Sequence, residues 1–196
     1  MTAPKYKRLA PEDRAAELVE AGLKVLAKGG ITAFTIDNLC KASGASRGLI
    51  GHHFGGKDGL LAACYAAAYA PLLQVIGTDT PLPLGALLDD LLSDRQFQRD
   101  GLNIWLALWG EIAVNPALRA EHLRQYDRYH RAIAAAIASH ALAHGRQVDP
   151  SRLASGLIAL IDGLWVEICI APDRMDPPAA RQLVEAFLAP HTGPLR

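Results

Sequence analysis

The stretch TIDNLCKASGASRGLIGHHF, residues 35–54, decides the fold of the first part of this 196-residue chain. Thr35 and Ser46 are residue types that cap helices, and each precedes a short run with helical spacing of apolar side chains. Ser43-Gly44 breaks the chain between the two runs. Two short helices on either side of a tight turn with a glycine form the helix-turn-helix plan.

The apolar positions of this stretch predict how the two helices pack. They recur at spacings that place them on facing sides, so we expect them to hold the pair together. These positions are Ile36, Leu39, Cys40, Ile50 and Phe54.

The second helix of such a unit lies in the DNA major groove, with its N-terminal residues nearest the base edges. Arg47 is the one long donor at that end and has the geometry to bond guanine O6 and N7. Gly48 has no side chain, so the backbone can approach DNA closely there. The candidate base-reading residues are Ser46, Arg47, Gly48 and Leu49.

Phosphate contacts are expected from the residues around this unit. Lys5, Lys7 and Arg8 precede the first helix as a basic arm, for which the alternative is a solvated tail. Lys57 opens the fourth helix, whose first N–H groups favour an anion. The Thr35 hydroxyl is a further phosphate candidate.

The charge distribution separates the two parts of the chain. The formal net charge is zero, from 20 basic and 20 acidic residues. Residues 1–70 hold nine basic and six acidic residues, whereas residues 71–196 hold eleven and fourteen. A mildly basic head on an acidic body indicates that nucleic acid is contacted at one end.

Helical spacing continues through the rest of the chain, and no run alternates with period two. We therefore expect an all-α protein of about nine helices, with a helix-turn-helix DNA-binding domain at 1–56 and a helical body at 57–196. The first helix is expected from Pro11 to Gly29-Gly30, and the fourth from Lys57, kinked or ended near Pro71. The later helices are expected at about 84–97, 101–114, 117–144, 150–171 and 177–189.

The sequence predicts a cytoplasmic protein with reduced thiols. Cys40, Cys64 and Cys169 are odd in number and widely spaced, which fits neither a disulfide framework nor a zinc site. The N-terminus shows no secretory apolar region. Residues 59–78 carry no charge, but six alanines and Pro71 favour a helix of the body over a membrane span.

Aromatic residues in the body predict a pocket for a cation. Trp105 and Trp109 share a helix face, as do Asp162 and Trp165. Aromatic faces beside a carboxylate are the arrangement that binds a quaternary ammonium group. Tyr126 is a further candidate, with Tyr129 beside it. The alternative is that these aromatics are ordinary core.

The run TIDNLCKASGASRGLIGHHFGGKDGLL resembles the signature of TetR-type one-component repressors. The segments GLNIWLALWGEIAVNPAL and GLIALIDGLW resemble the body of the choline-responsive, BetI-like branch. The resemblance implies an all-helical homodimer, with a three-helix DNA-binding head and a body that binds a small molecule. It also implies a dimer interface formed by the last two long helices.

The resemblance further implies which residues face DNA. They are Thr35, Arg47, Gly48, His52, His53 and Lys57. Two positions depart from the family pattern. Gly51 stands where many members carry Tyr, and His53 stands where a Tyr usually contacts phosphate, so that contact is expected to be weaker or sensitive to pH.

The predicted function is a repressor that binds an operator as a homodimer and is released by a small effector, with a quaternary amine such as choline as the candidate. The alternatives are a repressor of another hydrophobic ligand, or a helical enzyme or interaction protein. No catalytic motif, cofactor site or metal site is predicted; His140 and His144 in HALAH have no third ligand nearby.

Overall fold

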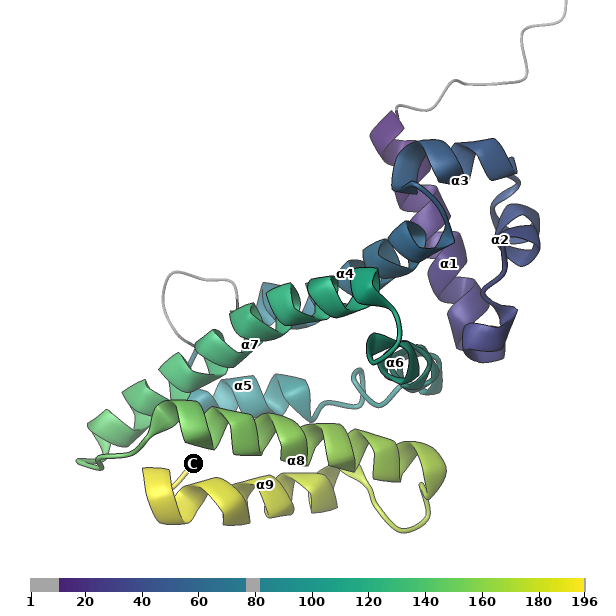
Figure 1. The fold of residues 1–196 in the computed structure, drawn as a ribbon. Coiled ribbons are helices and arrows are strands. Elements are labelled where there is room, and N and C mark those ends of the chain that lie inside the picture. Colours follow the sequence, from purple (N-terminus) through teal and green to yellow (C-terminus); the bar gives the residue numbers. More distant parts are fainter. Residues whose placement is uncertain (1–10, 77–81, 196) are drawn as a thin grey trace, which may run out of the picture.

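The computed structural model describes residues 11–76 and 82–195, and within these ranges its regular elements are all helices (Figure 1). This confirms the predicted all-α class. The arm residues Lys5, Lys7 and Arg8 lie outside the described residues. The helices are α1 (Pro11–Ala33), α2 (Ile36–Ser43), α3 (Arg47–Phe54), α4 (Lys57–Ile76), α5 (Leu84–Leu91), α6 (Arg99–Ile112), α7 (Pro116–Ala143), α8 (Pro150–Ile170) and α9 (Pro177–Thr192).

The first three helices form the head. The Thr35 hydroxyl accepts the Asn38 N–H at 3.3 Å and begins α2, and Gly44 ends it in the left-handed conformation that a glycine adopts without strain. The predicted stop at Gly29-Gly30 is confirmed as an interruption: Gly30 has the non-helical angles φ 60° and ψ −160°. A short helical continuation follows this kink, and α1 with the continuation extends to Ala33.

The predicted contacts between α2 and α3 are confirmed. Leu39 and Ile50 are 1% and 0% exposed, and they join Leu18, Leu26 and Phe34 in the core of the head. Ile36, Cys40 and Phe54 are half-buried against the same core. Burying a Leu or Ile side chain stabilises a fold by about 1.5–3 kcal/mol, so these residues fix the angle at which α3 is presented.

α4 leads from the head into the body (Figure 1). It contacts α1 and α3 at one end and packs along α7 at the other. Of the two predicted alternatives at Pro71, an end of the helix is wrong, because the helix continues to Ile76, and a kink stays a prediction. Pro71 is exposed and lies near the last turn of the helix.

α5 is shorter than predicted, ending at Leu91 instead of about residue 97. The Ser93 hydroxyl donates to the Asp90 carbonyl at 2.8 Å. The Asp90 carboxylate accepts from Arg95 at 2.6 Å and from Gln96 at 3.4 Å. These local bonds compete with helix hydrogen bonds and turn the chain toward α6.

α8 and α9 form the layer of the body farthest from the head (Figure 1). α9 packs on α8 through Gly156, where a Cβ atom would lie only 2.7 Å from the Phe187 ring. Among the described residues, α8 is the one helix that length and composition alone would allow to cross a membrane. It packs against α6, α7 and α9, as a core helix does.

Candidate DNA interface and effector site

The start of α3 exposes most of the predicted base-reading residues. Ser46 occupies the N-cap position without a side-chain cap bond, and Arg47 and Gly48 are exposed. The nearest atom to a Cβ built at Gly48 is the Ser46 Oγ, at 3.9 Å. Leu49 differs from the other three because it is half-buried against the core of the head. It supports the helix as well as lying near its exposed end.

The other predicted DNA-facing residues belong to α2, α3 and α4. Thr35 is exposed at the start of α2, and Lys57 is exposed at the start of α4. His52 is exposed and His53 half-buried in the last turn of α3, with ring centroids 5.2 Å apart in an edge-on arrangement. Thr35 and Lys57 thus lie at the starts of α2 and α4, whereas the two histidines lie at the end of α3 opposite to Arg47.

An ion pair links the two helices of the motif at this end. The Arg47 guanidinium donates to the Asp37 carboxylate, which lies in the first turn of α2. Both side chains stay open to solvent, at 73% and 62% exposure. The pair was not predicted, because the two residues are ten positions apart and on different helices.

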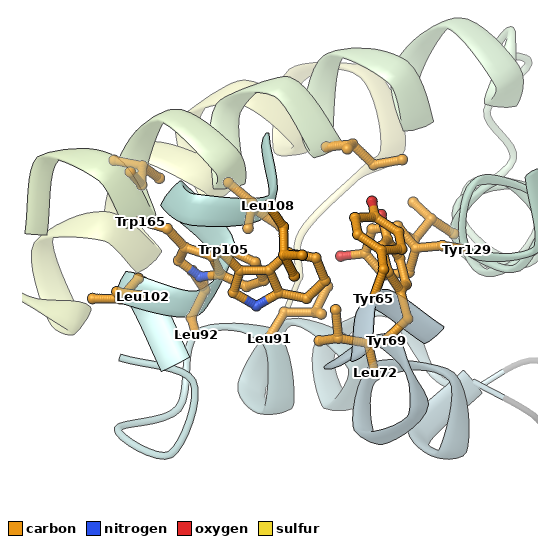
Figure 2. Close-up of a cluster of buried hydrophobic side chains, with 14 of the residues drawn as sticks. Tyr65, Tyr69, Leu72, Leu91, Leu92, Leu102, Trp105, Leu108, Tyr129 and Trp165 are labelled. Atoms are coloured by element: carbon orange, nitrogen blue, oxygen red, sulfur yellow. The ribbon is translucent and has the colours of Figure 1, made fainter. Parts of the chain in front are cut away.

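The body contains a cluster of aromatic rings centred on Trp105 (Figure 2). Trp105 lies 5.9 Å from Trp109 and 6.4 Å from Trp165, centroid to centroid. On its other side it meets Tyr65 at 5.7 Å and Tyr69 at 5.0 Å, both edge-on. The structure thus brings the three predicted tryptophans together and adds two tyrosines from α4.

Asp162 supplies the carboxylate of this site. Burial raises its pKa to about 7, and no hydrogen bond to it is seen among the described residues. Its negative charge also adds to the rise in pKa that burial causes at four tyrosines. These are Tyr65, Tyr69, Tyr126 and Tyr129. The charge of Asp162 therefore acts on tyrosines of α4 and α7, in an environment that disfavours that charge.

Tyr65, Tyr69 and His122 lie at this cluster and were not predicted as site residues. Tyr69 and Tyr129 lie with Tyr65 in one group, and Figure 2 shows their hydroxyl oxygens close together. The Tyr65 hydroxyl oxygen is 2.7 Å from Nδ1 of His122, whose pKa is lowered by burial. Tyr65 and Tyr69 share a helix face by their spacing of four, which was a usable signal.

The cluster is closely packed. Trp105 is 9% exposed, and Tyr65, Tyr69 and Tyr129 are less exposed still. Trp165 is 3% exposed, and no protein acceptor meets its Nε1 donor. A groove of about 730 Å³ lies elsewhere, between the α7–α8 turn and the end of α9. None of the predicted effector residues lines it. A ligand that enters the cluster must therefore displace side chains.

Two hydrogen bonds connect the body to the head and to α4. The Asn103 side chain on α6 donates to the Ala27 carbonyl on α1 at 3.2 Å. Asn115, between α6 and α7, donates to the Asp58 carboxylate at the start of α4 at 3.1 Å. The helices that carry the aromatic cluster, α4 and α6, are thus the helices that hold the head.

The three cysteines are free, and His140 and His144 bond to backbone carbonyls. Cys40, Cys64 and Cys169 are free thiols, and burial raises the pKa of Cys64 to about 12. His140 donates from Nε2 to the Pro194 carbonyl at 2.9 Å, and His144 donates from Nδ1 to the His140 carbonyl at 2.9 Å. Within the described ranges, no three His, Cys, Asp or Glu residues are grouped as metal ligands.

Comparison with known families gives two matches along the chain. Residues 18–64 match the family of bacterial regulatory proteins called the tetR family. Residues 83–192 match the BetI-type transcriptional repressor C-terminal domain. The first range contains the helix-turn-helix, and the second contains Trp105, Trp109 and Asp162.

Whole-chain comparisons agree with these matches. The HTH-type transcriptional regulator BetI 1 of Chromohalobacter salexigens is 30% identical over 89% of this chain and 88% of its own length. A transcriptional regulator of Pseudomonas aeruginosa PAO1 has the same fold, with a TM-score of 0.82, 30% identity, and 93% and 92% of the two chains covered. A regulator of Saccharomonospora viridis, solved in complex with choline, has a TM-score of 0.72 at 24% identity over 90% and 95%.

Proposed function

This chain belongs to the TetR family of transcriptional repressors and carries a BetI-type C-terminal domain, and we propose that a small quaternary amine such as choline controls its binding to DNA. Members of this family are DNA-binding regulators and not enzymes. We assign residues 1–56 to DNA binding and 57–196 to effector binding and dimerisation, in a protein that acts in the cytoplasm.

The observation that carries the effector proposal is the position of Asp162. This carboxylate is desolvated, its charge acts on four tyrosines, and no ion pair to it is seen among the described residues. Bringing a cation there offsets the cost of burying the charge, and each aromatic face adds about 0.5–2 kcal/mol. The choline complex of the structural relative from Saccharomonospora viridis supports the same ligand class.

We propose that two copies bind one operator. The dimer would be formed by α8 and α9, as the family resemblance implies. Leu157 and Leu164 of α8 and Val184 and Leu188 of α9 are buried in the chain's own core, so they are not available to a partner. The outer side of these helices carries Leu183 and Ile170, which are 45% and 66% exposed, and Gly163, whose surroundings are open.

The packing of the cluster suggests how effector and DNA are coupled. An effector that enters between Tyr69 and Trp105 displaces buried side chains of α4 and α6. α6 is bonded to the head through the Ala27 carbonyl, and α4 packs against α1 and α3. Effector binding would then change the spacing of the two recognition helices, and by reciprocity DNA would weaken effector binding to the same extent.

The proposal is tested with an operator selected by the protein from a pool of random-sequence duplexes. We expect one enriched sequence, bound with an affinity that falls steeply with salt, and release of the protein from it by choline. Tetramethylammonium serves as the minimal cation, and an uncharged isostere of choline serves as the control. Release by the isostere as efficiently as by choline would contradict a cation site.

The pKa of Asp162 predicts a pH dependence. Only the carboxylate attracts choline, whose own charge is constant, so choline affinity is expected to rise about tenfold between pH 6 and pH 8. Without ligand, the stability of the fold is expected to change with pH in the opposite direction to choline affinity. Because the folded-state pKa of about 7 lies above the ordinary value of an aspartate, this group's contribution to stability is lost as the pH rises toward 7. Calorimetric titration and thermal unfolding from pH 5 to pH 8 measure the two trends.

A further inference from the structure

The helix-turn-helix of this chain contains a single acidic residue. Between Thr35 and Lys57 the one carboxylate is Asp37, and the one arginine is Arg47. These two form the ion pair that links α2 to the first residue of α3. The pair thus lies at the end of α3 that approaches the bases in a helix-turn-helix complex.

The pair restrains the direction of the arginine. A guanidinium has five N–H donors in a rigid fork, and the structure engages Nη2 with Asp37. The donors on its other nitrogens stay free for a base edge or a phosphate. A long side chain that is already held loses less conformational freedom when it meets its target. Asp37 therefore favours contacts that Arg47 makes from this one position.

The same carboxylate disfavours binding to arbitrary DNA. Non-specific complexes depend on phosphate neutralisation, and a negative charge at the interface opposes it. On an operator, the base contacts of Arg47 compensate for that repulsion. On other sequences no base contact compensates for the repulsion. The carboxylate therefore increases the difference between operator affinity and non-specific affinity, both by repelling DNA and by positioning Arg47.

We propose that Asp37 is a specificity-determining residue of the head, which positions Arg47 for the operator and weakens binding to non-operator DNA. The inference rests on the proposed DNA-binding role of Arg47. It concerns the ratio of operator affinity to non-specific affinity, and not affinity alone.

The test compares Asp37→Asn and wild type on the selected operator and on a scrambled duplex of equal length, across a series of salt concentrations. We expect non-specific affinity to rise about threefold and its salt dependence to steepen, by up to about one unit of slope. The affinity ratio should fall at least fivefold. Glu20→Gln is the matched control, since Glu20 is an exposed carboxylate paired with Lys24 on α1. We expect it to leave the ratio unchanged.

A positioning role is separated from a general charge effect by repeating Asp37→Asn in an Arg47→Ala background. If Asp37 acts through Arg47, its effect on the ratio should there be less than twofold. An equal loss in both backgrounds, or an unchanged ratio in the single variant, overturns the inference. Failure of the wild type to select any sequence, or an Arg47→Ala variant that binds the operator normally, instead contradicts the proposed function.

Discussion

Replacing Asp162 by Asn is expected to lower the affinity for choline at least a hundredfold, while operator binding persists. Removing one member of a buried charge pair costs about 3–5 kcal/mol, because the other charge is left in a medium that cannot solvate it. Asn keeps the shape of the side chain, so the packing around Trp105 is retained. Without ligand the variant should be as stable as wild type or more so, since a buried titratable group is removed.

Isothermal titration with choline measures the affinity, and retardation of the operator with and without choline measures the response. Glu167→Gln is the control, because it removes an exposed carboxylate from the same helix. Asp162→Asn should also lose the rise in choline affinity between pH 6 and pH 8. A loss of less than threefold in choline affinity would show that Asp162 does not pair with the cation.

The head was predictable because its determinants are local. Thr35 as a cap, Gly44 in a left-handed turn, and the buried positions Leu39 and Ile50 all act within one helix or the next. Each is specified by a residue type at a fixed offset, and the structure agrees at each.

In the body, the predicted end of α5 was wrong. The cause was a set of side-chain bonds to Asp90 that compete with the helix.

The effector site was predictable only in part, because its members are far apart in the chain. Trp105, Trp109 and Trp165 were identified by residue type and by spacing within single helices. The meeting of Tyr65 and Tyr69 with Trp105 depends on how α4 packs beside α6, and no local pattern specifies that. In an alanine-rich helix, two tyrosines four residues apart are equally consistent with core.

Replacing Trp105 by Ala is expected to have the second large effect, on both stability and choline binding. Trp105 contacts two tryptophans and two tyrosines, and it is 9% exposed. Truncating a buried Trp to Ala costs about 3–5 kcal/mol in the free energy of unfolding. For a chain of this size, that loss lowers the unfolding temperature by about 6–20 °C.

Thermal unfolding at fixed protein concentration measures the first effect, and choline titration below the transition measures the second. Trp105→Phe is the matched control. It keeps an aromatic face toward Tyr65 and Tyr69, so it should retain measurable choline binding and most of the stability. If Trp105→Ala unfolds early but binds choline as well as Trp105→Phe does, then Trp105 supports the fold without forming the cation site. If the ring of Trp105 forms part of the cation site, Trp105→Ala should lose choline binding while Trp105→Phe keeps it, because Tyr65 and Tyr69 are unchanged in both variants.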